Sequence, residues 1–526
     1  MIERGEESDP ANARSTLQAR CVHLARMGMV VFHYDMVGYA DCTQIPMSVA
    51  HGFTKRRPED NAKDSCLFFS PQAEARTQSI MGLQTWNSIR AVDFLEQLDG
   101  VDANRIGVTG CSGGGTQTFV LAALDPRIKA AFPAAMVGTH MQGGCTCENC
   151  SLLRVGTGNV EIAALFAPKP MGLSSANDWT KEMEHDGFPE LQRLYDLYGE
   201  SDNTFLAPST HLPHGYNEIA RRTMYAWFAK HLVGGDGADS IDVQDVYEGN
   251  MDDDSPFQEK SFTFLTPEQL SVWNDEHPRP ESGIAAESNV LQQWNLARPS
   301  LESSKEKRDL LHALLAPESK DFELKFDELE GDRPTFNIQM TDRLSDRVWR
   351  FRITMPEADI ERSNTMNIVW IADNFDGGRS NDIESIISAT EDPSAVLLEI
   401  DGQQAVKENS LVENGREAAG YTFGYNSTEL ALHSRAISYL ISDTATPLKL
   451  DRINLYSEFN SAPSMIVGAI DSEVPIDTIV LPNKISFDDI DSIRHAYFLP
   501  GIALLGGFEG VMELANPKSV RYLTDE

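Results

Sequence analysis

The chain has 526 residues, of which 41% are hydrophobic and 24% are charged, and its formal net charge is −36. This length suggests two or three domains, and the apolar fraction excludes extended disorder over most of the chain. The sequence contains no run of about 18 apolar residues, so we expect no membrane span. A strongly negative chain also has little with which to neutralise phosphates, which argues against nucleic acid as a partner.

The acidic residues are concentrated in the second part of the chain. Residues 1–235 contain 20 Lys and Arg against 26 Asp and Glu, whereas residues 236–526 contain 24 against 54. We interpret the acidity of the second part as an adaptation to solubility rather than as a binding site for a cationic partner. The seven cysteines all precede residue 151, an arrangement that does not suit a disulfide scaffold.

From residue 12 to residue 233 the sequence alternates helical and strand patterns. A helical stretch over 12–27 ends at Gly28, and the apolar run 29–41 predicts a strand buried on both faces. Further helices are predicted over 73–98, 116–124 and 218–232, and further strands over 105–110, 128–137, 168–175 and 203–210. This alternation predicts an α/β fold, in which a mostly parallel sheet carries helices on both faces.

The pattern changes after residue 235. Residues 236–319 are rich in Asp, Glu, Ser and Pro and predict an acidic linker with local helix, for instance over 266–276. Shorter alternating strands, which suit an antiparallel edge sheet, are then predicted over 322–329, 335–340 and 348–355. We therefore expect a first domain over 1–235, a linker over 236–319 and a second α/β domain over 320–526.

The most specific motif is G-x-S-x-G, formed by Gly110 to Gly114 around Ser112. It lies between a predicted strand and a predicted helix, and a nucleophilic serine must protrude from such a sharp strand-to-helix turn. The helix directs its first N–H groups at the turn, so the backbone N–H of Gly113 is a candidate oxyanion donor. A phosphate-binding glycine loop is the alternative, but no Gly-Lys-Ser or Gly-Lys-Thr follows the motif.

A nucleophilic serine needs a base and an acid, and the chain supplies both in the order that this kind of turn requires. Asp178 follows one predicted strand, and His214 follows the next, just before the last helix of the first domain. The alternative for Asp178 is an N-cap of the following helix, and the alternative base is His211. We favour His214 because the adjacent Gly215 lets the backbone bend it towards the serine.

Four sequence runs carry a resemblance to a known family: VVFHYDMVGYAD, SIRAVDFLEQLDGVDANRIGVTGCSGGGTQT, FAPKPMGLSSANDWT and HLPHGYN. Through them, residues 18–232 resemble the α/β-hydrolase superfamily, specifically the acetyl xylan esterase-like bacterial hydrolases. The resemblance implies an α/β-hydrolase fold with Ser112 as nucleophile, Asp178 as acid and His214 as base. It implies no cofactor and no metal.

The chain departs from this family at its beginning. In the family, an oxyanion-hole strand and a loop containing His-Gly precede the first helix, whereas this chain begins at Met1 inside that loop. We therefore expect half of the oxyanion hole to be missing, and we interpret the chain as a fragment or as the product of a start codon placed too late. Its first residues contain no signal peptide, but one further upstream would make the protein periplasmic or secreted.

A C-x-C-x-x-C motif, made of Cys145, Cys147 and Cys150, follows a predicted strand at the rim of the site. With His140 as a fourth ligand, a zinc site is one interpretation of this motif. We favour a disulfide or simple packing of the rim loop, and we expect no metal ligands.

The second half of the sequence repeats part of the first. Residues 451–461 align with residues 104–114, and in this alignment Phe459 takes the place of Ser112 while serines replace the flanking glycines. The chain also ends before a histidine loop could follow. We therefore predict a degenerate, non-catalytic α/β-hydrolase-like domain over 320–526, with coincidental similarity of two α/β segments as the alternative.

Together these observations predict a serine carboxylester hydrolase that works through an acyl-enzyme. By resemblance, its substrate is an acetylated or otherwise esterified carbohydrate. One alternative is a serine peptidase of the prolyl-oligopeptidase type, but no propeller repeat of about 40–50 residues is visible. The other is a non-catalytic binding protein derived from a hydrolase. The sequence leaves the oligomeric state open.

Overall fold

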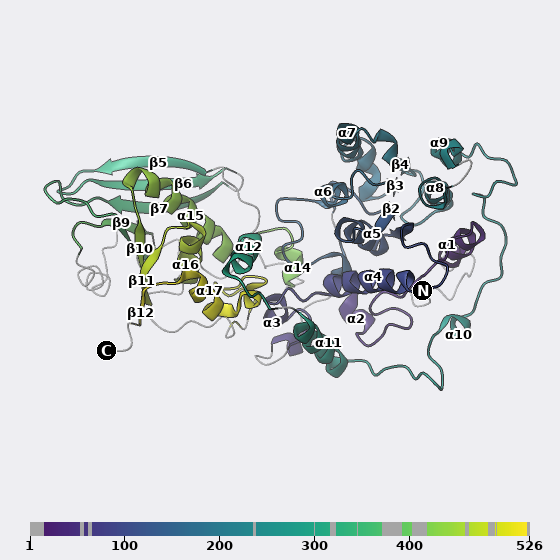
Figure 1. The fold of residues 1–526 in the computed structure, drawn as a ribbon, viewed down its shortest axis with the longest axis horizontal. Coiled ribbons are helices and arrows are strands. Elements are labelled where there is room, and N and C mark those ends of the chain that lie inside the picture. The colour runs from purple at the N-terminus through teal and green to yellow at the C-terminus, as the bar shows by residue number, and fades with distance from the viewer. Residues whose placement is uncertain are drawn as a thin grey trace. The chain divides into compact units, whose positions relative to one another are not determined.

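The computed structural model describes residues 15–52, 57–61, 66–141, 143–234, 238–298, 300–315, 322–343, 346–370, 392–401, 418–457, 462–481, 490 and 492–522. The chain forms two compact units (Figure 1). The first comprises residues 1–54 and 78–290, and the second comprises residues 55–77 and 291–526. In the part of the chain that is described, no helix is both long enough and apolar enough to cross a membrane.

The first unit is built on a parallel sheet that has, among the described residues, four strands in the order β1-β2-β3-β4. The strands are β1 (Ile106–Cys111), β2 (Ile128–Ala134), β3 (Met171–Ser175) and β4 (Thr204–Pro208). The helices between and after them are α5 (Gly113–Leu124), α6 (Asn159–Ala164), α7 (Phe188–Tyr198) and α8 (Glu218–Phe228). The predicted alternation of strands and helices is therefore confirmed.

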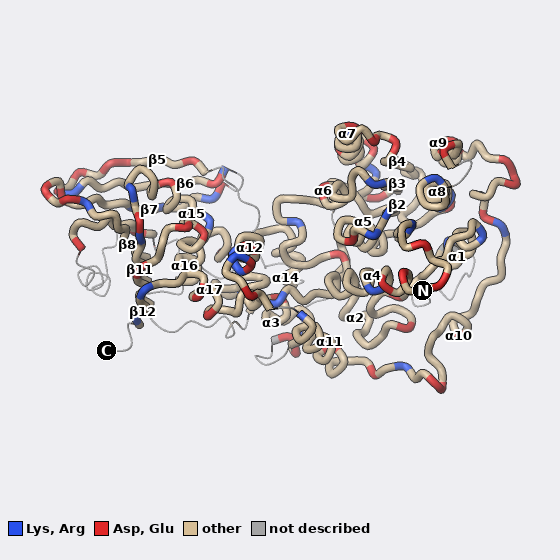
Figure 2. The backbone as a smooth tube through the Cα atoms, viewed as in Figure 1, with Lys and Arg blue, Asp and Glu red and all other residues tan. Residues whose placement is uncertain are grey.

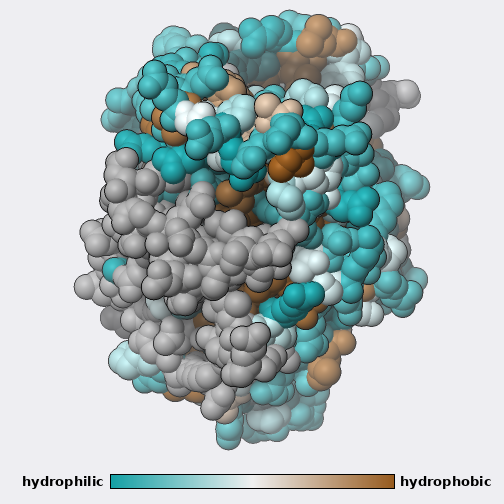
Figure 3. Space-filling model, turned by 90° about the vertical axis from the view of Figure 1, so that its left-hand side faces the viewer, coloured by the Kyte–Doolittle hydropathy of each residue, from teal (hydrophilic) through white to brown (hydrophobic). Residues whose placement is uncertain are grey.

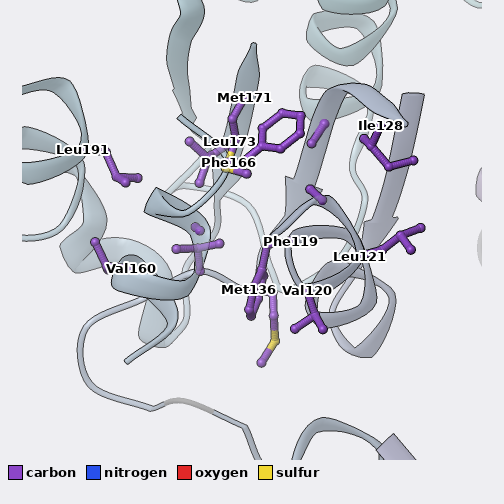
Figure 4. Packing of buried hydrophobic residues seen from close by; sticks show 14 of the residues in the cluster. Phe119, Val120, Leu121, Ile128, Met136, Val160, Phe166, Met171, Leu173 and Leu191 are labelled. Carbon is purple, nitrogen blue, oxygen red and sulfur yellow. The ribbon is translucent and has the colours of Figure 1, made fainter. Parts of the chain in front are cut away.

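Two hydrophobic clusters cover the two faces of this sheet, because successive side chains of a strand point in opposite directions. Ala131 of β2 packs in one cluster with Phe119 of α5 and Met171 of β3 (Figure 4). The next residue, Phe132, packs in the other cluster with Trp227 of α8. The first cluster also contains residues of α4 (Ile80–Glu96), α6 and α7, and the second contains residues of α1 (Ser15–Arg26), α8 and α9 (Val243–Glu248).

The predicted helix over 73–98 is interrupted near its start. The structure contains a short helix α3 (Pro71–Glu74) and then α4, and Thr77 between them has a φ of 53°. The Ser79 side chain accepts a hydrogen bond from the N–H of Gly82 at 3.0 Å and so caps α4. The positive φ and the new cap explain why the two helices do not merge.

The predicted strand over 29–41 is wrong. The structure has no strand in this run, and only one side of it is covered: Met29 and Val31 pack against the cluster around α8, whereas Val30 is 57% and Phe32 is 42% exposed. A buried strand needs hydrogen-bonded neighbours and two covered faces. Within the described residues, β1 is therefore at an edge of the sheet.

The segment 238–283, predicted as part of a linker, packs on the first unit. Both oxygens of the Glu259 carboxylate accept hydrogen bonds of 2.6 Å from Arg221, which is only 7% exposed. The Trp273 indole N–H donates to the backbone oxygen of Asp41 at 2.9 Å. Much of the acidic region thus belongs to the first unit. The segment 238–283 contains α9 and α10 (Pro267–Leu270), and the chain passes into the second unit within α11 (Ile284–Ala297).

The second unit contains a mixed sheet in the order β12-β11-β10-β8-β9-β7-β6-β5. Its strands are β5 (Phe322–Leu329), β6 (Thr335–Asp342), β7 (Arg347–Thr354), β8 (Thr365–Trp370), β9 (Val396–Ile400), β10 (Arg452–Ser457), β11 (Ile476–Leu481) and β12 (Ser519–Tyr522). β5, β6 and β7 pair antiparallel with each other, and β7 pairs antiparallel with β9, while β8 to β12 are parallel. The predicted antiparallel edge is therefore confirmed.

The helices of the second unit are α12 (Ser304–Leu314), α14 (Ala419–Thr422), α15 (Glu429–Leu448), α16 (Ala462–Asp471) and α17 (Gly507–Ala515). Of these, α16 packs against β10 and β11 of the sheet and against α15. Acidic residues lie along β5, one of the two outer strands. Figure 2 shows Asp and Glu along β5. In Figure 3, the part of the visible face that is coloured by hydropathy is mainly hydrophilic, in keeping with the many charged residues of the second part of the chain.

Candidate active site

Ser112 occupies a sharp turn between β1 and α5. Its φ of 58° and ψ of −125° form a backbone conformation that residues other than glycine rarely adopt, at a cost of about 1–3 kcal/mol. The Ser112 N–H donates to the backbone oxygen of Ala134, at the end of β2, at 3.1 Å. This hydrogen bond to the sheet helps to stabilise Ser112 in an unfavourable backbone conformation.

Glycines surround Ser112 because parts of the turn have no space for a side chain. A Cβ atom on Gly110 would lie 2.3 Å from the backbone oxygen of Gly114, and one on Gly115 would lie 2.7 Å from the Cβ of Met136. By contrast, a Cβ on Gly114 would meet nothing within 4 Å. The steric requirement of the turn thus falls on Gly110 and on Gly115, one residue beyond the G-x-S-x-G motif.

Asp178 and His214 come from the loops after β3 and β4 and meet in a short hydrogen bond. His214 Nδ1 lies 2.6 Å from Asp178 Oδ2, and because a carboxylate only accepts, Nδ1 carries the hydrogen. The ring then has its lone pair on Nε2, as a general base requires. The other carboxylate oxygen, Oδ1, accepts from the N–H of Thr180 at 2.7 Å and from its hydroxyl at 2.6 Å. Asp178 is thus both a partner of His214 and an N-cap.

These hydrogen bonds determine the charge of the carboxylate. Burial by itself raises the pKa of Asp178, but the hydrogen bonds from His214 and Thr180 outweigh it, so the pKa lies below its ordinary value. The Asp178 side chain is 8% exposed and that of His214 is 32% exposed. An ionised, shielded acid therefore supports an imidazole that remains accessible.

The first unit has a cavity of about 1680 Å³ next to the candidate residues. Ser112, Gly113 and His214 line it, and so does Trp179, whose ring centre lies 4.8 Å from that of His214. His211, the alternative base, is exposed and is not part of this lining. His214 and Ser112 thus line one cavity, whereas His211 lies outside this lining.

Gly113 is the first residue of α5, a helix of 12 residues that begins directly after Ser112. The first N–H groups of a helix have no acceptor inside the helix, and the helix dipole favours a negative charge beside them. The predicted oxyanion donor therefore lies where a charge that develops next to Ser112 would meet it.

The rim cysteines form a cluster that differs from the ligand set of the zinc interpretation. Cys145 and Cys147 lie near His51, with their three ligand atoms within 4.8 Å of one another, whereas Cys150 is not in this cluster. His140 is exposed, and its Nδ1 lies 2.9 Å from the hydroxyl of Thr139. None of the seven cysteines forms a disulfide in this structure. Sequence reasoning missed His51, because nothing in the spacing of the motif points to a residue so far upstream.

The same loop brings a buried carboxylate, Glu148, next to the nucleophile turn. Its Oε2 accepts from the backbone N–H groups of Gly144 at 2.8 Å and Cys145 at 2.9 Å, and a Cβ on Gly113 would lie 3.3 Å from Oε1. Burial raises the pKa of Glu148 above its ordinary value, and the two backbone hydrogen bonds only partly oppose this. These bonds tie the Glu148 side chain to the backbone of its own loop, beside Gly113.

Comparison with known proteins gives the class of this site. Residues 41–151 match the family model described as glucuronyl esterase, fungi. A 4-O-methyl-glucuronoyl methylesterase of Phanerochaete carnosa (strain HHB-10118-sp) is 24% identical over 225 residues, covering 35% of this chain and 54% of the relative. The chain thus spans about half the length of this curated relative.

Solved structures give similar matches. Methylesterase BT1017 is 25% identical, with a TM-score of 0.40 over 56% of this chain and 57% of the other. The glucuronoyl esterase catalytic domain from Hypocrea jecorina is 18% identical, with a TM-score of 0.27, and the match covers 34% of this chain and 62% of the other. Acetyl xylan esterase 1 from Thermoanaerobacterium sp. JW/SL YS485 is 11% identical, with a TM-score of 0.26 over 43% and 89%.

The parallel sheet and the strained serine turn define the first unit as an α/β-hydrolase, and the predicted resemblance to this superfamily is confirmed. Within the first unit and the segment inserted in it, residues 41–151 are similar to the glucuronyl esterase family, and the curated relative is a 4-O-methyl-glucuronoyl methylesterase.

Proposed function

We propose that the first unit is a carbohydrate carboxylesterase in which Ser112, Asp178 and His214 are nucleophile, acid and base. The observation that carries this proposal is the 2.6 Å hydrogen bond between Asp178 and His214 beside a cavity that the strained Ser112 also lines. The match of residues 41–151 to an esterase family supports the substrate class. No observation favours the peptidase or the binding protein.

In the proposed reaction, Ser112 Oγ attacks the ester carbonyl while His214 Nε2 takes its proton. The ionised Asp178 stabilises the imidazolium that forms, and the N–H of Gly113 donates to the oxyanion. His214 then gives the proton to the leaving alcohol, and water cleaves the acyl-enzyme in a second round of the same steps. Removal of one oxyanion donor from such a site typically costs about 10²–10³ in kcat.

We further propose an ester of a uronic acid as the substrate, so that the sugar acid itself becomes the acyl group on Ser112. The family model and the 4-O-methyl-glucuronoyl methylesterase relative support this choice over an acetyl ester. Trp179 lines the cavity beside His214 and offers an aromatic wall that a sugar ring can contact.

The test compares three substrates on the full chain: the methyl ester of 4-O-methyl-glucuronic acid, p-nitrophenyl acetate and a chromogenic peptide anilide. We expect the highest kcat/KM on the uronic acid ester, lower activity on the acetate and none on the anilide. Ser112→Ala provides the control and should remove all of the activity. Preference for acetate would overturn the uronic acid assignment, and cleavage of the anilide would overturn the esterase assignment.

The second unit is, we propose, a degenerate α/β-hydrolase-like domain without acyl-transfer chemistry. Its β10–β11 ladder supports a common origin with the β1–β2 ladder of the first unit. After the first pair of each ladder, Ile106 with Ile128 and Ile453 with Ile476, the register shifts before the ladder continues. These two shifts fall at the same position of the sequence alignment. Phe459, which replaces the nucleophile in that alignment, lies outside the described residues.

A further inference from the structure

Three side chains with metal-binding chemistry meet beside the nucleophile turn, and the proposed reaction uses none of them. His51 directly follows α2 (Met47–Ala50), and Cys145 and Cys147 lie at the 3₁₀ turn over Thr146–Glu148. His51 is 9% and Cys147 is 4% exposed, and the ligand atoms of all three residues lie within 4.8 Å of one another. Thiolate and imidazole are the ligands that zinc and similar thiophilic cations prefer.

The hydrogen bonds of His51 fix which ring nitrogen faces the thiols. Its Nε2 lies 2.6 Å from the backbone oxygen of Val37, and because a carbonyl only accepts, Nε2 carries the hydrogen. In the neutral ring the lone pair is then on Nδ1, which lies 3.6 Å from the Sγ of Cys145. A histidine that binds a metal almost always donates its other ring N–H to a carbonyl or carboxylate in this way.

Backbone hydrogen bonds fasten the two loops that bear these ligands. The N–H of Gly52 donates to the Sγ of Cys145 at 3.1 Å, an arrangement that stabilises a thiolate. Both the backbone N–H and the hydroxyl of Thr146 donate to the oxygen of Gly52, at 3.2 Å and 2.9 Å. The site therefore needs no large rearrangement of the loops to assemble.

A buried arginine holds the cysteine loop from its other side. Arg154 is 2% exposed and donates to the backbone oxygen of Glu148 at 3.0 Å, to Asn149 Oδ1 at 3.1 Å and to Asn159 Oδ1 at 2.8 Å. Asn149 in turn donates to the backbone oxygens of Gly143 and Cys145. This network fixes the backbone that carries the thiols.

The distances among the three ligand atoms lie nearer to those of a metal site than to those of a disulfide. Zinc bonds of about 2.3 Å to sulfur and about 2.0 Å to nitrogen place a nitrogen and a sulfur ~3.5 Å apart and two sulfurs ~3.8 Å apart at tetrahedral angles. The His51–Cys145 distance of 3.6 Å already fits. The sulfurs of Cys145 and Cys147 lie 3.1 Å apart and must separate by roughly 0.7 Å for zinc. A disulfide would instead draw them to about 2.05 Å and give the imidazole no function.

We propose that His51, Cys145 and Cys147 bind one thiophilic divalent cation, zinc by the type of its ligands. With three protein ligands, the cation has a fourth position open, and it joins the two loops that bear its ligands. These loops lie next to the proposed oxyanion donor, because a Cβ on Gly113 would lie 3.3 Å from the Sγ of Cys147. This site departs from the zinc ligand set considered for the sequence motif, because His51 takes the place of His140. It does not depend on the proposed esterase activity.

The test uses the full chain, reduced with a phosphine, stripped with a chelator and titrated with Co²⁺. We expect one Co²⁺ per chain, with thiolate-to-cobalt charge-transfer absorption that Zn²⁺ then abolishes. Cys147→Ser and His51→Ala should lose this absorption. The matched controls Cys150→Ser and His140→Ala should retain it, because these residues lie in the same region but outside the cluster.

Circular dichroism identifies any variant that does not fold, and Cys145→Ser then serves as a second test of the thiol ligands. Bound Zn²⁺ should also raise the thermal midpoint of the wild type but not that of folded Cys147→Ser. Failure of the reduced wild type to bind Co²⁺, or equal binding by wild type and Cys147→Ser, would overturn the proposal. Mass spectrometry before reduction tests for a disulfide between Cys145 and Cys147, which lowers the mass by two hydrogens. If this disulfide is found and the reduced protein takes up no Co²⁺, the two cysteines are a redox pair and not metal ligands.

Discussion

Strand β1 and helix α5 of the first unit align in sequence with β10 and α16 of the second, and this pair separates what the proposed common scaffold needs from what the proposed chemistry needs in addition. Both strands are followed by a buried helix, and both ladders shift register after their first pair. The glycines differ: where the first unit has Gly115, the continued alignment gives the second unit Ala462, which is fully buried. At the position where the turn around Ser112 has no space for a Cβ, the second unit thus has a buried side chain.

The sharpest test of this comparison is to remove the nucleophile from the first unit and to supply one in the second. Ser112→Ala should reduce ester hydrolysis by a factor of about 10³ or more while leaving the fold intact, because the serine contributes chemistry rather than packing. Phe459→Ser added to this variant should restore nothing, since the aligned sequence of the second unit has Ser457 and Ser461 in place of Gly110 and Gly114. Initial rates on p-nitrophenyl acetate measure both effects, and any recovery in the double variant would contradict the assignment of the second unit.

The two histidines of one loop provide the next largest effect. His214→Ala should lower kcat nearly as much as Ser112→Ala, because nucleophile and base act as one unit, and the double variant should be no worse than either single one. His211→Ala should stay within a few-fold of the wild type, because it lies outside the cavity lining. A larger loss for His211→Ala than for His214→Ala in steady-state kinetics would transfer the role of base to His211.

A methyl group at the helix start should have a moderate effect in one unit and a small one in the other. Gly115→Ala brings a Cβ to 2.7 Å from that of Met136, and such overpacking costs about 1–3 kcal/mol of stability and displaces Ser112. The reciprocal Ala462→Gly should cost about 1 kcal/mol through helix propensity and leave the esterase activity unchanged. Urea unfolding measures the loss of stability in each variant, and kcat measures the loss of activity. Equal effects of the two substitutions on kcat would contradict this prediction.

The smallest expected effect concerns a nearly buried carboxylate of the second unit, Glu429, which has no part in the proposed chemistry. Glu429 pairs with Arg347 and lies 3.5 Å from His433. Burial raises the pKa of Glu429, but hydrogen bonds from His433 and Arg347 outweigh it and leave the pKa below its ordinary value. Its ionised form therefore stabilises the fold above the unfolded pKa of about 4.3 and loses this contribution as the pH falls through the folded pKa.

Glu429→Gln should accordingly lower the free energy of unfolding by about 1–3 kcal/mol at pH 7, with a smaller difference at pH 4 and unchanged esterase activity. Urea unfolding at the two pH values measures the difference. Glu328→Gln, an exposed residue of β5, is the matched control and should have little effect at either pH. A difference that grows towards low pH would show that the sign of the pKa shift is wrong.

Sequence alone predicted the elements that depend on local sterics. The turn around Ser112 could be predicted from the G-x-S-x-G motif, because Gly110 stands where the turn has no room for a Cβ. The order of serine, acid and base follows from the order of the strands. Asp178 and His214 were placed at the ends of strands in this way, and the structure brings them together. Their catalytic roles remain predictions for the variants above to test.

Features that depend on tertiary partners could not be predicted. The run 29–41 has the composition of a buried strand, but its burial is decided by neighbours, and those leave Val30 and Phe32 exposed. His51 contacts Cys145 across 94 positions of the chain, a distance that no motif spacing encodes. The acidic segment 238–283 looks like a linker by composition, although its carboxylates and aromatic rings pack on the first unit.

The pairing of Arg221 with Glu259 limits how this hydrolase can be exchanged between proteins during evolution. A recombination event that joined a new partner after residue 235 would leave a guanidinium in a nearly dry place without its carboxylate, and the Tyr225 hydroxyl would lose the acceptor that it has at 2.8 Å. An unpaired buried charge of this kind is strongly destabilising. The smallest transferable gene segment therefore extends beyond the last recognisable helix of the hydrolase, through the acidic stretch that a motif search would discard.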